Sequence, residues 1–113
     1  MTWRIRRDLG NLAAPTNGFP STTDMSLKFI DLFAGCGGLS LGLMQAGHKG
    51  LFAVEKTGHA FSTLRRNLLE GDREGFKFAW PESIPRQNHD IIELLASHEN
   101  ALLALRGQVD MIA

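Results

Sequence analysis

This 113-residue chain lacks several features that would place it in particular protein classes. Its single cysteine, Cys36, excludes an internal disulfide and fits a reducing cytoplasm. No run of about 18 apolar residues occurs, so we expect no membrane-spanning helix. The formal net charge is zero, which argues against the broad basic face of a free-standing nucleic-acid-binding protein. A small soluble domain, or part of one, remains.

The chain divides into two parts by composition. Residues 11–23 contain Pro15, Gly18 and Pro20 among Ser, Thr and Asn residues, which is typical of a linker. We therefore expect residues 1–24 to be a flexible N-terminal tail and residues 25–113 to form the folded part.

Strand and helix patterns alternate after the tail. We expect strands over 27–33, 51–55 and 109–113, helices over 39–46 and 59–69, and shorter helical segments over 90–95 and 101–105. Phe76, Phe78 and Trp80 alternate with other residues and predict one more short strand. This order predicts an α/β fold with a mostly parallel sheet and helices on its faces.

The join between the first strand and the first helix carries the strongest local signal. Gly35, Gly37 and Gly38 lie there, and glycine lets backbone approach a ligand closely because it has no Cβ. Glu55 ends the next strand, twenty positions after Gly35. A carboxylate at that place can accept hydrogen bonds from two ribose hydroxyls. The pattern therefore predicts a site for an adenosine-containing ligand.

Two other interpretations of this join stay open. The glycines can serve only a tight turn, with Glu55 as a solvated strand end. An NAD-binding oxidoreductase domain is the second alternative, but its fingerprint requires a further glycine where this chain has Ser40. The serine counts against a nicotinamide cofactor.

Residues 29–40, Phe-Ile-Asp-Leu-Phe-Ala-Gly-Cys-Gly-Gly-Leu-Ser, resemble the first motif of the DNA (cytosine-5) methyltransferases. Residues 51–67 resemble the second motif of that family, and Asp90-Ile91 the third. Residues 109–113 are similar to the strand that leads into the family's catalytic loop. The resemblance covers residues 27–113 and implies the N-terminal portion of a Rossmann-like, S-adenosylmethionine-dependent methyltransferase fold. It also places the last strand beside the first, in the middle of the sheet.

The resemblance also implies a set of residues that bind S-adenosylmethionine. These are Asp31, Phe33, Ala34, Gly35, Cys36, Gly37, Gly38, Leu39, Glu55, Lys56, Asp90 and Ile91. Phe33 would pack against the adenine or the methionine part, and residues 34–39 would line the methionine part with backbone groups.

In the same resemblance, Glu55 would hold the ribose, Asp90 would accept from the adenine amino group, and Ile91 would cover the ring. Lys56 would lie beside the adenine, where the family often has a bulky apolar residue. Its aliphatic stem can still cover a ring face.

The family transfers a methyl group from S-adenosylmethionine to C5 of cytosine in DNA, after a cysteine thiolate attacks C6 of the flipped-out base. That cysteine belongs to a Pro-Cys pair, which this sequence lacks. We interpret Cys36, in the glycine turn, as a small packing residue. We therefore expect no catalytic residue here and no activity of the chain alone.

By this interpretation the chain supplies the cofactor half of a restriction–modification enzyme, and double-stranded DNA binds through a C-terminal part outside it. A complementary chain is a further expected partner. The alternative is a non-catalytic fragment or subunit that only binds cofactor or a partner chain. The four histidines lack metal-ligand spacing, so we expect them to be surface residues and expect no metal site.

Overall fold

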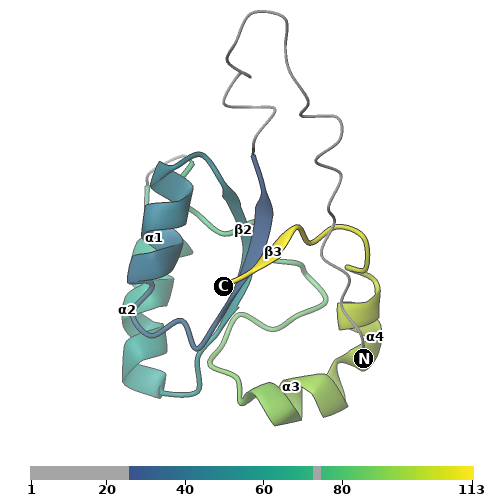
Figure 1. Cartoon of the computed structure of the whole chain (residues 1–113). Coiled ribbons are helices and arrows are strands. Elements are labelled where there is room, and N and C mark those ends of the chain that lie inside the picture. Colours follow the sequence, from purple (N-terminus) through teal and green to yellow (C-terminus); the bar gives the residue numbers. More distant parts are fainter. Residues whose placement is uncertain (1–25, 73–74) are drawn as a thin grey trace, which may run out of the picture.

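A three-stranded, all-parallel sheet forms the centre of the computed structural model, which describes residues 26–72 and 75–113. The strands are β1 (Lys28–Leu32), β2 (Lys49–Val54) and β3 (Met111–Ile112), in the order β2-β1-β3 (Figure 1). This confirms the predicted α/β fold and the position of the last strand beside the first. The predicted tail lies outside the described residues.

Helices cover both faces of the sheet. Figure 1 shows α1 (Gly38–Gln45) and α2 (Gly58–Leu68) on one side of the strands, and α3 (Ile91–Ser97) and α4 (Glu99–Leu103) on the other. None of the helices in the described part of the chain is long and apolar enough to cross a membrane.

The central strand β1 is buried on both faces, as expected for a parallel strand between two helical layers. Asp31 points to the α1 side, where it contacts Ser40. Ile30 and Leu32 point to the opposite side and line, together with Leu94 of α3, an apolar groove of about 260 Å³. Because side chains alternate between the two faces of β1, the polar Asp31–Ser40 contact lies on one face and the apolar groove on the other.

The predicted strand over 76–80 is wrong. Phe78 and Trp80 are buried and Ala79 is exposed, so the alternating burial is present. However, the Ala79 N–H donates one bond to the Gly50 carbonyl, at 2.9 Å, and no ladder with β2 forms in the described residues. This segment is a loop that lies against the outer edge of β2.

Aromatic rings explain why this loop is fixed without a ladder. The Trp80 ring meets Phe52 of β2 and Phe61 of α2 edge-on, with centroids 5.9 and 6.0 Å apart. Phe78 contacts Phe29 and Trp80 in the same geometry. Such edge-to-face pairs are favourable beyond their buried area. Side-chain packing therefore replaces strand pairing here.

The helices begin and end close to their predicted limits. Phe61, Leu64 and Leu68 form the buried face of α2. Gly47 follows α1 with φ of +95°, the left-handed conformation that is common just after a helix. The second of the two short C-terminal helices begins at Glu99, two residues before the predicted start.

Candidate cofactor site

The candidate site lies at the carboxyl ends of β1 and β2, where open α/β sheets bind their ligands. Its first part is the turn between β1 and α1, residues 33–40, which we call the glycine corner. Phe33, Gly35 and Gly37 have φ of +54°, +58° and +94°. The Ala34 N–H donates to the Val54 carbonyl at 3.0 Å, which ties the corner to the end of β2.

The glycines of the corner serve different purposes. A Cβ on Gly37 would lie 2.8 Å from the Leu68 side chain of α2, so Gly37 allows the corner to pack against that helix. A Cβ on Gly35 or Gly38 would meet no atom within 4 Å. The backbone at these two positions therefore borders open space that a ligand can approach closely.

Two large apolar side chains of the corner are exposed. Phe33 is 78% exposed and Leu39 is 56% exposed. A positive φ at a non-glycine residue such as Phe33 is strained, and strain of this kind concentrates at functional sites. Phe33 therefore offers a free aromatic face beside the glycine backbone, as required for contact with a flat ligand.

The Glu55 carboxylate joins the glycine corner to the end of β2. Its Oε1 accepts a hydrogen bond from the Gly35 N–H at 2.8 Å, and its Oε2 accepts one from the Thr57 N–H at 2.7 Å. The Thr57 N–H, helped by that of Gly35, lowers the pKa of Glu55 below its ordinary value. Each oxygen keeps accepting capacity for another donor, because a carboxylate has about four lone-pair sites.

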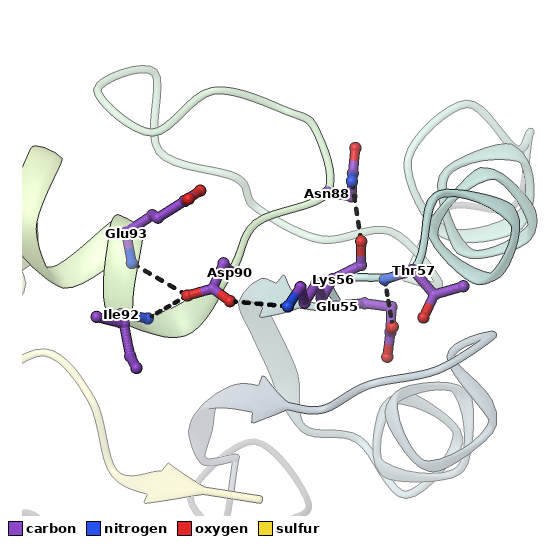
Figure 2. A network of polar contacts seen from close by, with 7 residues as sticks. All are labelled: Glu55, Lys56, Thr57, Asn88, Asp90, Ile92 and Glu93. Carbon is purple, nitrogen blue, oxygen red and sulfur yellow. Dashed lines mark hydrogen bonds and ion pairs between the residues drawn. The ribbon is translucent and has the colours of Figure 1, made fainter.

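The second part of the site, residues 55–57 and 88–93, is a set of polar contacts that we call the base-side network (Figure 2). The His89 N–H donates to the Glu55 carbonyl at 3.0 Å, and Asn88 Nδ2 donates to the Lys56 carbonyl at 2.9 Å. Lys56 Nζ lies 3.4 Å from Asp90 Oδ2. Three contacts thus hold the segment after β2 against the segment before α3.

Asp90 is also the N-cap of α3. Its Oδ1 accepts from the N–H groups of Ile92 and Glu93, at 2.9 and 3.2 Å. The Glu93 N–H contributes most to lowering the pKa of Asp90, with smaller contributions from Ile92 and Lys56. The carboxylate is therefore ionised at neutral pH, and the half-buried Ile91 follows it directly at the start of α3.

Asp31 lies apart from the other predicted site residues. It is 1% exposed, and its Oδ2 accepts from the Ser40 hydroxyl at 2.5 Å. Burial raises the pKa of the Asp31 carboxyl, and the hydrogen bond from Ser40 opposes that rise. Asp31 therefore connects β1 to α1 beneath the corner rather than facing the open space.

Two of the sequence interpretations are corrected. Cys36 is exposed, so it does not act as a packing residue. His89 is 8% exposed and its Nε2 lies 2.8 Å from the Pro85 carbonyl, so the prediction that all histidines are surface residues is wrong. No group of potential metal ligands occurs within residues 26–72 and 75–113.

Sequence reasoning missed three contributors to the site. Ser40 binds Asp31, Thr57 supplies one N–H to Glu55, and Asn88 holds the backbone of Lys56. For Ser40 the signal was present, because a hydroxyl on the buried side of a helix needs a partner. The other two contacts depend on how the loops fold.

The chain is similar to known DNA methylases. Residues 27–94 match the C-5 cytosine-specific DNA methylase family. The type II methyltransferase M.HgiGI of Herpetosiphon aurantiacus is 51% identical over 43 residues, which are 38% of this chain and 34% of that protein. M.PspPI of a Psychrobacter species is 45% identical over 58 residues, covering 47% of this chain and 14% of that protein. M.Eco47II of Escherichia coli is 46% identical over 48 residues, covering 38% of this chain and 12% of that protein.

The matched segments thus span about a third of M.HgiGI and a much smaller share of the other two relatives. The family match includes the glycine corner, Glu55, Lys56 and Asp90. It covers more than half of the 113 residues. The chain therefore belongs to the C-5 cytosine-specific DNA methylase family.

Proposed function

We propose that this chain binds S-adenosylmethionine at the carboxyl edge of its sheet and forms the cofactor-binding part of a DNA cytosine-5 methyltransferase. The complete enzyme would transfer the methyl group to C5 of cytosine in double-stranded DNA, in a restriction–modification system. Family membership and the names of the type II relatives support the class of reaction.

The observation that carries this proposal is the position of the Glu55 carboxylate. It is ionised, it borders the glycine corner, and both of its oxygens are oriented by backbone N–H groups. Two adjacent hydroxyls, such as those of a ribose, can each donate to one of these oxygens. Because Gly35 N–H fixes one oxygen, the receptor for the ribose is oriented before ligand arrives.

The other site residues would contact different parts of the cofactor along the carboxyl edge of the sheet. The open backbone at Gly35 and Gly38 would receive the methionine part, and the exposed Phe33 ring would pack against the ligand. Asp90 would accept from the adenine amino group, and Ile91 would cover the base. Bound S-adenosylmethionine supplies a methyl group activated by its sulfonium; the residues here bind and orient it.

The steps on DNA would use residues outside this chain. A Pro-Cys pair is absent from the 113 residues, and we place the nucleophile and the DNA-reading region in a C-terminal part or in a complementary chain. A chain that only binds cofactor or a partner is the other candidate. Mixing with a C-terminal half of a relative and assaying cytosine methylation separates the two, since a binding module yields no methylated DNA.

Calorimetric titration tests the binding proposal directly. We expect S-adenosylmethionine to bind and NAD not to bind. Glu55→Ala should weaken binding by at least about tenfold, because one hydrogen bond to a charged group contributes about 1.5–3 kcal/mol. Glu82→Ala, which removes an exposed carboxylate from the loop after Trp80, serves as the matched control and should bind as the wild type does.

Thermal melts of both variants report whether they remain folded. A Glu55→Ala chain that melts normally and binds S-adenosylmethionine with undiminished affinity contradicts the proposed site. Binding of NAD alone would instead favour an oxidoreductase domain.

A further inference from the structure

Lys56 differs from the other site residues because its ammonium faces Asp90, the carboxylate that would accept a hydrogen bond from the adenine amino group. Its Nζ lies 3.4 Å from Asp90 Oδ2 (Figure 2). We propose that Lys56 competes with the adenine amino group for Asp90, so that cofactor binding displaces the lysine and Lys56 sets the affinity. This inference rests on the proposed S-adenosylmethionine site.

The two oxygens of Asp90 have different tasks. Oδ1 accepts from the N–H groups of Ile92 and Glu93, and these bonds hold the first turn of α3. Further donors at Oδ1 would compete with the helix cap. Oδ2 is the oxygen left for an outside donor, and it faces the Lys56 ammonium. An ammonium is a charged donor and a base amino group a neutral one, and both require the same oxygen, so the lysine competes with the amino group.

The Lys56 side chain can leave without disturbing the site around it. The side chain is 79% exposed, so no packing holds it in place. Its backbone is fixed, because Asn88 Nδ2 binds its carbonyl and the His89 N–H binds the carbonyl of Glu55. Release of Asp90 therefore requires only rotation of the lysine side chain.

The exposure of the Lys56 side chain limits how much the ion pair can change the ligand affinity. Solvent-exposed ion pairs contribute little, and salt screens them further. Removing the Lys56 charge should therefore raise the affinity by about two- to fivefold at low salt. The gain should vanish at high salt, where the ion pair no longer opposes binding in the wild type.

The ligand for the test is S-adenosylhomocysteine, because it carries the adenine without the sulfonium charge that Lys56 would repel. Calorimetry at about 0.01 M and about 1 M salt spans Debye lengths of about 30 and 3 Å. Lys56→Met keeps a long apolar stem, and we expect it to bind more tightly than the wild type at low salt only. Lys56→Arg keeps the charge and should give no gain over the wild type at either salt concentration. Lys49→Met, which removes a lysine from the opposite end of β2, should match the wild type.

A second pair of variants isolates Asp90. Asp90→Ser keeps a hydroxyl oxygen that can cap α3 but lacks the oxygen that faces Lys56. In the Asp90→Ser background, Lys56→Met should give no gain in affinity. S-inosylhomocysteine, whose base has no amino group, should likewise show no gain with Lys56→Met in the otherwise unchanged chain.

The outcomes separate this inference from the proposed function. If the wild type binds S-adenosylhomocysteine and Lys56→Met binds equally or more weakly at low salt, competition is refuted and the stem or charge of Lys56 supports the ligand. A gain that persists unchanged in Asp90→Ser, or at high salt, also refutes it. Failure of the folded wild type to bind either S-adenosylmethionine or S-adenosylhomocysteine refutes the proposed function, and the competition with it.

Discussion

The glycine corner and the base-side network each contain an aspartate, but the surroundings shift the pKa values of these two carboxyl groups in opposite directions. Asp31, beneath the corner, is buried, and burial raises its pKa. Asp90, in the network, is held by backbone N–H groups that lower its pKa. One carboxyl serves as an internal connection between β1 and α1, and the other is ionised and lies beside Lys56 near the surface.

This contrast separates two properties of the site. Packing and buried contacts determine the shape of the corner, so changes there should alter the free energy of unfolding. Exposed polar contacts determine the network, so changes there should alter ligand affinity and its dependence on salt. The Lys56 variants test the expected effect of the network on ligand affinity. The variants below test the expected effect of the corner on the free energy of unfolding.

Gly37→Ala should give the largest loss of stability. Gly37 has φ of +94°, and a Cβ there would lie 2.8 Å from Leu68. Strain and crowding together should reduce the free energy of unfolding by about 2–3 kcal/mol, as measured by urea denaturation. Gly38→Ala, where a Cβ meets nothing within 4 Å, should change it by no more than about 0.5 kcal/mol. Equal effects of the two variants would show that the corner does not depend on packing against α2.

Asp31→Ala should have the next largest effect. It leaves the Ser40 hydroxyl, which is 0% exposed, without its acceptor. An unsatisfied buried hydroxyl should cost about 1–2 kcal/mol of unfolding free energy, again measured in urea. Asp31→Asn retains an acceptor for Ser40 and should recover most of the loss. An Asp31→Ala chain as stable as the wild type would show that this contact does not hold the corner.

The pH dependence of Asp31→Asn should give the smallest effect. The pKa of Asp31 is raised in the folded chain above its ordinary value of 3.8, so folding favours the protonated carboxyl. The stability of the wild type relative to Asp31→Asn should therefore fall as pH rises from below 3.8 through the raised pKa, and then level off. Urea denaturation of both chains from acid to neutral pH measures this difference. A difference that grows with pH would contradict a buried, desolvated carboxyl.

Hydrophobic periodicity and glycine placement predicted most of the fold. The strands β1 and β2 and the helices α1 and α2 appear within two residues of their expected limits. The segment at 76–80 shows where the pattern fails. Alternating burial of Phe78 and Trp80 arises there from ring packing on Phe29, Phe52 and Phe61, and only the tertiary structure reveals that no ladder accompanies it.

The site was predictable where one residue acts through its own backbone or charge. Gly35 and Glu55 are of this kind, and they meet in the structure at 2.8 Å. The burial of Asp31 depends instead on how α1 packs over β1, and the pairing of Lys56 with Asp90 depends on how the loop before α3 returns to the end of β2. Sequence alone could name these side chains but not their partners, so their roles in cofactor binding remain predictions.

The aromatic loop along β2 has a consequence for how this fold can be extended. The Ala79 N–H donates a hydrogen bond to the Gly50 carbonyl, and the Phe78 ring would collide with any side chain placed at Gly50. A further strand beside β2 would therefore have to displace the Trp80 ring from that edge of the sheet. Within residues 26–72 and 75–113, β3 forms the other edge of the sheet, so a further strand would extend the sheet beside β3.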